Sequence, residues 1–165
     1  MIAPPARVLV SACLLGAEVR HHGGAATIEH PILRRWREEG RIVGVCPEMA
    51  GGLPTPRPAA EIRGLSVVTR EERDVTGAFE TGAAVAVRMA KELGIRVAVL
   101  KSRSPSCGIG QIYDGTFSGR LVDGDGITAA ALRHEGVQVF DEYQLDAADA
   151  ALSGLEDDDV AGVRI

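Results

Sequence analysis

The sequence is poor in several features that identify common classes of protein. Aromatic residues make up only 4% of the chain. No run of about 18 apolar residues occurs, so no membrane-spanning segment is expected. Basic residues are not in excess, because 18 Lys and Arg face 23 Asp and Glu and the net charge is −5. This balance argues against a general nucleic-acid binder, which would present a basic face.

Cysteine is scarce as well. The chain has three cysteines, an odd number, and no C-x-x-C pair. A disulfide framework of the kind found in small secreted domains is therefore not expected, and the spacing matches no common zinc pattern. The first seven residues lack the charged and apolar regions of a signal peptide. These features predict a protein of the reducing cytoplasm.

What is present is the pattern of an α/β domain. A chain of 165 residues can bury a substantial core, roughly 70% of its unfolded surface. Short apolar runs, read as strands, alternate with segments of helical periodicity. The expected strands are 7–12, 41–45, 95–100 and 137–140, and the expected helices are 30–39, 77–93 and 127–134. This alternation predicts a three-layer, Rossmann-like α/β fold with a mostly parallel sheet of about four core strands.

Two long segments between these elements are candidate functional loops. Residues 47–58 are rich in Pro and Gly, and residues 102–126 are rich in Gly and Asp. Loops of this length are uncommon in compact domains unless they carry function. A hairpin around 112–121 is expected inside the second loop. Residues 65–69 are expected to form a short edge strand, and Thr76 is expected to cap the following helix.

The end of the chain differs in composition from the rest. Residues from about 143 onward are acidic and rich in alanine. The sequence therefore predicts an α/β domain over 1–142 and a C-terminal extension over 143–165, as a weak helix or a disordered end.

The three cysteines share one kind of position. Cys13, Cys46 and Cys107 each lie close behind an apolar, strand-type run, where a loop begins. The carboxyl ends of parallel strands meet at one edge of a sheet, where ligand sites form, so the three thiolates can converge. Each alone could be apolar filler, but their loop positions favour shared metal or iron–sulfur ligation. Three ligands leave one coordination position open, as a catalytic centre needs.

Polar residues in the same loops could serve such a centre. Glu48 follows Cys46 by two residues, and a carboxylate near thiolates should have a raised pKa and could move protons. Ser104 and Ser106 flank a proline and place two hydroxyls next to Cys107. Solvent exposure for the glutamate and turn capping for the serines are the structural alternatives.

Three further loop residues are candidates for contact with substrate. Arg57 and Lys101 bring positive charge that could offset the thiolates or hold an anionic substrate. Gly108 would allow the backbone to approach a ligand closely. His21 and His22 follow the first cysteine loop, and because adjacent side chains point apart, at most one of them could be a metal ligand.

Several motifs together resemble a known family. V-S-A-C-L-L-G, V-C-P-E-x-x-G-G-L, L-K-x-x-S-P-S-C-G and I-Y-D-G-T-F occur in this order between about Val8 and Glu142. They resemble the iron–sulfur thiouracil desulfidase family, long catalogued as a bacterial domain of unknown function. The chain departs from many relatives at His21-His22-Gly23, where they carry Tyr-Asp-Gly.

The resemblance implies a cofactor and a reaction. It implies a [4Fe–4S] cluster bound by Cys13, Cys46 and Cys107, with a fourth iron free to take the sulfur of a thiocarbonyl substrate. It also implies that Glu48 and Ser104 transfer protons, with Ser106 as the alternative serine. The reaction expected from it is a non-redox desulfuration, in which C=S becomes C=O, water supplies the oxygen and sulfide leaves.

Two other functions fit the same residues. One is a zinc-dependent hydrolase with a three-cysteine site and an open water position. The other is a non-catalytic module that binds a cluster or sulfide. The expected partner is a small thiolated pyrimidine, no membrane is involved, and a thiolated tRNA base is the one nucleic-acid substrate left open.

Overall fold

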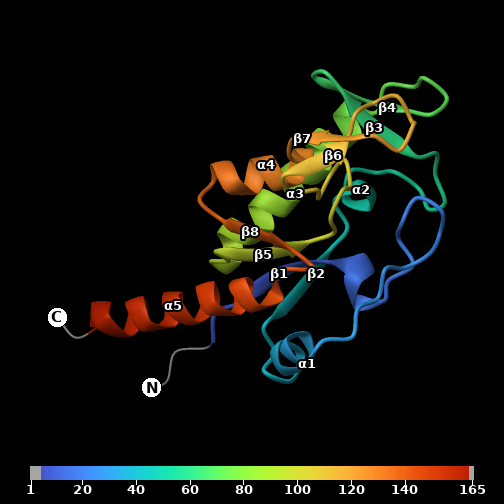
Figure 1. Ribbon diagram of the computed structural model, residues 1–165. Helices are drawn as coiled ribbons and strands as arrows, with labels where there is room; N and C mark the ends of the chain where they lie inside the picture. The colour runs from blue at the N-terminus through green and yellow to red at the C-terminus, as the bar shows by residue number, and fades with distance from the viewer. Residues whose placement is uncertain (1–4, 164–165) are drawn as a thin grey trace.

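A four-stranded parallel sheet forms the centre of the molecule (Figure 1). The computed structural model describes residues 5–163. The sheet has the strand order β2-β1-β5-β8. Its strands are β1 (Val8–Ser11), β2 (Ile42–Val45), β5 (Val97–Leu100) and β8 (Gln138–Asp141). The predicted α/β fold with a mostly parallel sheet is confirmed.

The two central strands are apolar because helices cover both faces of the sheet. Every residue of β1 and of β5 is buried, whereas the outer strands β2 and β8 are each only partly buried. A strand with both faces covered is expected to be continuously hydrophobic rather than alternating. The sequences V-L-V-S and V-A-V-L of β1 and β5 follow this rule.

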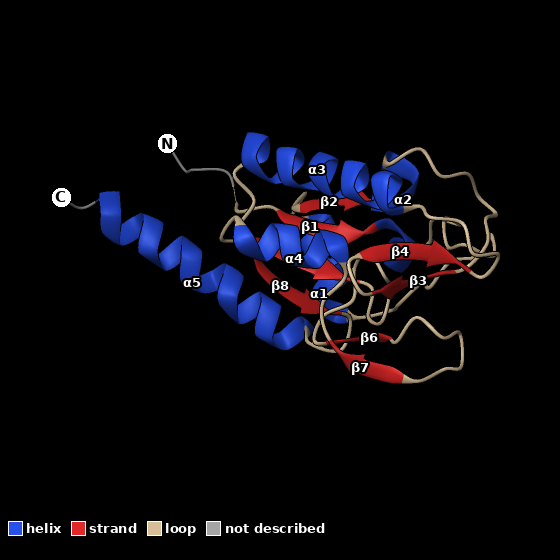
Figure 2. Cartoon of the chain, turned by 90° about the horizontal axis from the view of Figure 1, so that it is seen from above, coloured by secondary structure: helices blue, strands red, loops and turns tan. Residues whose placement is uncertain are grey.

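Two pairs of helices cover the opposite faces (Figure 2). The helices are α1 (Pro31–Glu38) and α5 (Leu145–Val163) on one face, and α3 (Thr76–Leu93) and α4 (Ile127–His134) on the other. Leu9 of β1 packs with Ala86 and Leu132 on the α3/α4 face. Val10, the next residue, packs with Trp36 on the α1/α5 face. This alternation follows from the period of two along a strand.

The order of the strands creates a crevice at the carboxyl edge of the sheet. From β1 the chain passes through α1 to β2 on one side, and then through α3 to β5 on the other side of β1. The direction of winding therefore reverses at β1. In open α/β sheets, ligands bind at such a reversal, outside the carboxyl ends of the strands.

Three predictions about local structure were incomplete or wrong. The loop 47–58 begins with a short helix, α2 (Pro47–Ala50). The predicted edge strand exists as β4 (Ser66–Thr69), but it pairs with β3 (Ala60–Arg63), an unpredicted strand, in a separate antiparallel hairpin. Thr76 is not the N-cap of α3, because that residue is Val75 and the Thr76 hydroxyl accepts a hydrogen bond from Val67 N at 2.8 Å. Its bond to a neighbouring strand takes the place of the capping bond.

The predicted second hairpin is confirmed, and the C-terminal helix is longer than expected. The hairpin consists of β6 (Gln111–Tyr113) and β7 (Leu121–Asp123). In α5, Leu145, Ala148 and Leu152 are buried in the core of the α1/α5 face. Among the described residues, none of the helices combines the length and the apolar character that crossing a membrane requires.

Candidate functional site

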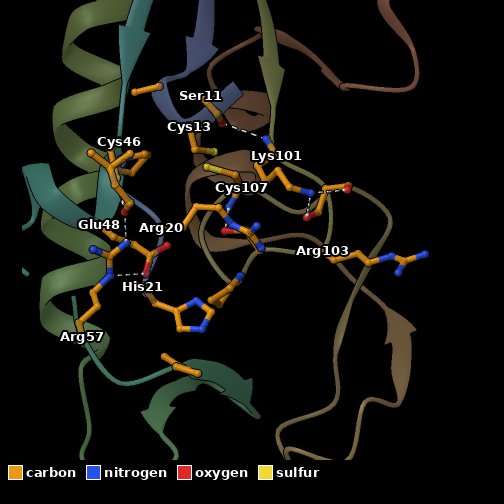
Figure 3. Close-up of a pocket in the computed structure, with 18 of the residues that line it drawn as sticks. Ser11, Cys13, Arg20, His21, Cys46, Glu48, Arg57, Lys101, Arg103 and Cys107 are labelled. Atoms are coloured by element: carbon orange, nitrogen blue, oxygen red, sulfur yellow. Dashed lines mark hydrogen bonds and ion pairs between the residues drawn. The ribbon is translucent and has the colours of Figure 1, made fainter. Parts of the chain in front are cut away.

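A cavity of about 380 Å³ lies at the carboxyl ends of β1, β2 and β5 (Figure 3). All three cysteines line it. Cys13 lies in a short 3-10 helix, η1 (Ala12–Leu15), directly behind β1. Cys46 lies between β2 and α2, and Cys107 lies in the long loop behind β5. All three are free thiols, brought together from three strand ends.

The three thiols are close enough to influence one another electrostatically. Burial raises the pKa of Cys107 to about 12, and the charges of Glu48 and Cys13 add to this rise. Burial also raises the pKa of Cys13; Lys101 opposes the rise and Cys46 adds to it. Buried thiols of this kind stay protonated unless a positive centre replaces their protons, which is what metal binding does.

The donor set fits an iron–sulfur cluster. Three cysteine sulfurs line one cavity, and soft thiolate ligands of this kind hold such clusters in proteins. Within the part of the chain that the structure describes, no group of three or more His, Cys, Asp or Glu side chains is placed to hold a single metal ion.

Glu48 reaches the cavity from α2 and pairs with a buried arginine. Arg57 Nε donates to Glu48 Oε1 at 3.2 Å. The guanidinium also donates to the carbonyl oxygens of Val19 (2.8 Å) and Pro54 (3.1 Å) and to Thr55 Oγ1 (2.9 Å). Both side chains line the cavity; that of Arg57 is 4% exposed and that of Glu48 is 18% exposed, so the carboxylate is the more accessible partner.

The environment of Glu48 suits a base. Burial raises the pKa of its carboxyl, and the opposing charge and hydrogen bond of Arg57 do not cancel the rise. A carboxylate with a raised pKa takes a proton more readily near neutral pH.

The position of α2 depends on two close contacts with α3. A Cβ on Gly82 would lie 1.9 Å from Pro47 O, and a Cβ on Gly51 would lie 1.9 Å from Ala78 O. The two backbones can approach this closely only because both positions lack a side chain. The contact fixes the distance between α3 and α2, the helix that carries Glu48.

The two serines next to Cys107 have different surroundings. Ser104 lines the cavity, and its Oγ accepts hydrogen bonds from Ser106 N at 3.1 Å and Cys107 N at 3.0 Å. With these two donors on its oxygen, the hydroxyl proton of Ser104 is left to donate to a ligand. Ser106 is fully buried, and its Oγ lies 2.8 Å from Thr128 Oγ1, outside the cavity lining.

A second ion pair lies on the other side of the cavity. Lys101 Nζ lies 2.8 Å from Glu142 Oε2, and Glu142 Oε1 accepts a hydrogen bond from Ser102 N at 2.8 Å. Here the Lys101 side chain is 21% exposed and that of Glu142 is 5% exposed. Burial opposes ionisation of Glu142, but the hydrogen bonds from Lys101 and Ser102 outweigh it and lower the pKa.

The remaining predicted residues lie near the cavity but differ in role. Gly108 does not line it; a Cβ there would lie 2.7 Å from Ser104 O, so the glycine permits backbone packing within the loop. His21 lines the cavity, whereas His22 turns away and accepts a hydrogen bond from Gly24 N at 3.0 Å. Burial, with the charges of His22 and nearby arginines, lowers the pKa of His21.

Sequence reasoning missed several residues of the site. Arg20, Tyr113 and Tyr143 line the cavity, as does Glu61, whose Oε1 accepts hydrogen bonds from the backbone of the 115–117 segment. Glu142 was missed as the partner of Lys101. It follows the predicted strand 137–140 at the same edge of the sheet as the cysteines, and this position could have identified it.

Comparison with known proteins agrees with this geometry. A family model described as 2-thiouracil desulfurase matches residues 8–144. The uncharacterized protein YbbK of Bacillus subtilis (strain 168) is 42% identical over 148 residues, covering 84% of this chain and 97% of YbbK. A solved structure of the [4Fe-4S]-dependent thiouracil desulfidase TudS is 49% identical, with a TM-score of 0.88 over 90% of this chain and 98% of that one. The chain belongs to the 2-thiouracil desulfurase family.

Proposed function

We propose that this protein is a [4Fe–4S]-dependent desulfidase that converts the C=S group of a thiolated pyrimidine such as 2-thiouracil into C=O and releases sulfide. The observation that carries the proposal is the convergence of three free cysteines on one cavity that also presents a carboxylate and a serine hydroxyl. Membership of the family and the likeness to TudS support it.

The three cysteines are the residues that would hold the cluster. Cys13, Cys46 and Cys107 supply soft sulfur donors, and in this set no fourth cysteine is available, because the chain has only three. When bound, a cluster held in this way supplies an iron without a protein ligand, which binds thiocarbonyl sulfur and makes the ring carbon more electrophilic.

Glu48 is proposed as the general base. Its carboxylate faces the cavity, and its raised pKa suits removal of a proton from water at neutral pH. Arg57 holds the carboxylate through a hydrogen bond from its Nε. The oxygen of the activated water would then form a bond to the ring carbon.

Ser104 is proposed as the proton donor to the substrate. Its oxygen already accepts two backbone N–H bonds, so its own proton can be donated to the ring nitrogen or to sulfur. The same two N–H groups would stabilise negative charge on the oxygen after the proton has left.

The reaction balances without an oxidant or a reductant. One oxygen passes from water to the ring carbon, and the C–S bond breaks with its electron pair remaining on sulfur. The two protons of water pass through Glu48 and Ser104 to the departing sulfide. The sum is C=S plus H₂O giving C=O plus H₂S.

Anaerobic reconstitution tests the proposal. The wild-type protein should take up about one cubane cluster per chain, turn brown and release sulfide from 2-thiouracil. Replacing any one of Cys13, Cys46 and Cys107 with serine should abolish both the cluster and turnover. The control is Ser153→Ala, a change on the exposed surface of α5 that should leave both unchanged.

Two results would contradict the proposal. One is turnover that persists in all three cysteine variants. The other is a colourless protein whose activity zinc alone restores, as the zinc-hydrolase alternative predicts. A panel of thiolated bases, nucleosides and tRNA in the same assay determines which class of thiolated pyrimidine is converted fastest.

Two further points belong to the proposal. The cytoplasm is the proposed location, since thiolate ligands require a reducing compartment. Residues 1–142 are proposed as the catalytic unit, in agreement with the end of the family match at residue 144, and 143–165 as an extension that packs on it through Leu145, Ala148 and Leu152.

A further inference from the structure

The two ion pairs of the site turn opposite charges toward the cavity. In the pair of Arg57 with Glu48 the arginine is buried, whereas in the pair of Lys101 with Glu142 the glutamate is buried. Lys101 lines the cavity and Glu142 does not, whereas both Glu48 and Arg57 line it. The more exposed charge is therefore a carboxylate on the side of Cys46 and an ammonium on the side of Cys13 and Cys107 (Figure 3).

Lys101 is held in place by its surroundings. Its backbone N–H donates to Ser11 Oγ at 2.9 Å, which ties the end of β5 to the end of β1. Its ammonium contacts Glu142 Oε2 at 2.8 Å and Ser102 Oγ at 3.2 Å. A charge whose partners are all in place needs no reorganisation during a reaction, which is the condition for strong electrostatic stabilisation.

The reaction collects negative charge in this part of the cavity. With a cluster bound the three cysteines would be thiolates, whose charge the iron would offset only in part, Glu48 adds a carboxylate, and sulfur leaves with an additional electron pair. Arg57 is paired with Glu48, Arg20 also lines the cavity, and Arg103 is exposed to solvent. Lys101 lines the cavity, is held by Glu142 and Ser102, and its charge opposes the rise in the pKa of Cys13.

We propose that Lys101, held by Glu142, supplies the fixed positive charge that stabilises the negative charge gathering on sulfur as sulfide leaves. The role is electrostatic, because the hydrogen bonds of the ammonium are directed at Glu142 and Ser102. Glu142 is then a positioning residue. This inference rests on the proposed desulfidase function.

The test compares reconstituted variants by two measurements, the kinetics of sulfide release and the reduction potential of the bound cluster. Lys101→Gln should lower kcat by about 100-fold, with a much smaller change in KM. It should also move the reduction potential to a more negative value, since a nearby positive charge favours the reduced cluster. Lys101→Arg keeps the charge and should retain the wild-type potential and most of kcat.

Two more variants complete the comparison. Glu142→Gln should fall between Lys101→Gln and the wild type, because the ammonium remains but loses its anchor. Lys91→Gln removes a lysine that pairs with Glu135 at 3.1 Å away from the cavity, and it should match the wild type in both measurements.

Wild-type kcat and potential in a fully loaded Lys101→Gln variant would overturn the inference. If Lys101→Gln binds no cluster, the Glu142→Gln variant provides the test instead. Wild-type kcat and reduction potential in that variant would also overturn the inference. A loaded wild-type protein that releases no sulfide would contradict the desulfidase function itself. The order of the reduction potentials would still test the charge of Lys101 in that case.

Discussion

The two sides of the cavity use the same kind of ion pair in opposite orientations. On the side of Cys46, Arg57 is the more buried partner and Glu48 the more exposed; on the side of Cys13, Glu142 is the more buried and Lys101 the more exposed. In both pairs the more buried partner makes close hydrogen bonds to the backbone, whereas Lys101 Nζ reaches a backbone oxygen, that of Ser102, only at 3.4 Å. Arg57 donates to two carbonyl oxygens, and Glu142 accepts from a backbone N–H.

The comparison shows how the fold determines which member of an ion pair is the more exposed to the cavity. A buried charge is tolerated when its hydrogen bonds are satisfied, so the backbone groups nearby decide which partner can be buried. The consequence is seen in the pKa values of the two glutamates. Burial raises the pKa of Glu48, as a base requires, whereas two hydrogen bonds outweigh burial and lower the pKa of Glu142, as a fixed counter-charge requires.

The largest expected effect concerns the carboxylate that faces the cavity. Glu48→Gln should lower kcat by about 1,000-fold, because a neutral amide cannot take a proton from water. The apo protein should also lose stability, because Arg57 is left without its carboxylate partner. Glu142→Gln is the matched variant and should show a smaller kinetic loss. Wild-type turnover in a fully cluster-loaded Glu48→Gln variant would contradict the assignment of Glu48 as the base and Glu142 as a counter-charge.

The next effect concerns the buried cation. Arg57→Gln should lower the free energy of unfolding by about 3–5 kcal/mol, because the change breaks a buried ion pair and leaves carbonyl groups without donors. Urea denaturation of the apo protein measures this. Arg103→Gln, at an exposed cation on the same cavity, should change stability by less than about 0.5 kcal/mol. Equal stability of the two variants would mean that the hydrogen bonds and ion pair of Arg57 contribute nothing to the free energy of unfolding.

Gly82, which packs against α2, offers a way to disturb the Glu48 side of the cavity without changing the Lys101 side. Gly82→Ala should destabilise the protein by about 2–3 kcal/mol and lower kcat, because its Cβ would lie 1.9 Å from Pro47 O and push α2 away. Gly77→Ala on the same helix meets nothing within 4 Å and should be neutral or stabilising by up to about 1 kcal/mol. Thermal unfolding and sulfide release measured on both variants check this. Unchanged kcat in Gly82→Ala would show that the activity of Glu48 does not depend on the position of α2 relative to α3.

The smallest expected effect is a pH dependence on the side of Lys101. Glu142→Gln should cost about 1–2 kcal/mol of unfolding free energy at pH 7. The pKa of Glu142 is lower in the folded state, so its contribution is complete above the unfolded value of about 4.3 and is lost as the pH falls through the folded value. The stability difference between wild type and variant should therefore shrink in acid. A difference that stays constant down to pH 2 would contradict the assignment.

The sheet was predictable because its strands carry local signals. The apolar runs of β1 and β5 end where a Gly- or Pro-containing loop begins, and both strands are buried as their sequences predict. The hairpin of β3 and β4 was missed, because the alternation of apolar and charged residues in β3 (Ala60–Arg63) covers only four residues, too few to identify a strand without its partner. Thr76 was misread for a similar reason, since its hydroxyl bonds to Val67 across the chain.

The serine loop shows the same limit within the site. Ser104 and Ser106 are equivalent in the sequence, each one residue from Pro105. The structure gives Ser104 a place on the cavity and turns Ser106 toward Thr128 on α4, a helix that begins some twenty residues later. No local pattern contains that contact.

The sequence by itself determined the parallel α/β class, the positions of Cys13, Cys46 and Cys107 at strand ends, and the presence of acids and cations in the loops. These features depend on hydrophobic periodicity and on loop composition, which are local properties. Only the tertiary structure decided that Lys101 and Glu48 are the more exposed members of their ion pairs and that Arg57 and Glu142 are the more buried ones. The physical reason is that burial of a charge depends on which backbone groups satisfy it, and those groups come from distant parts of the chain.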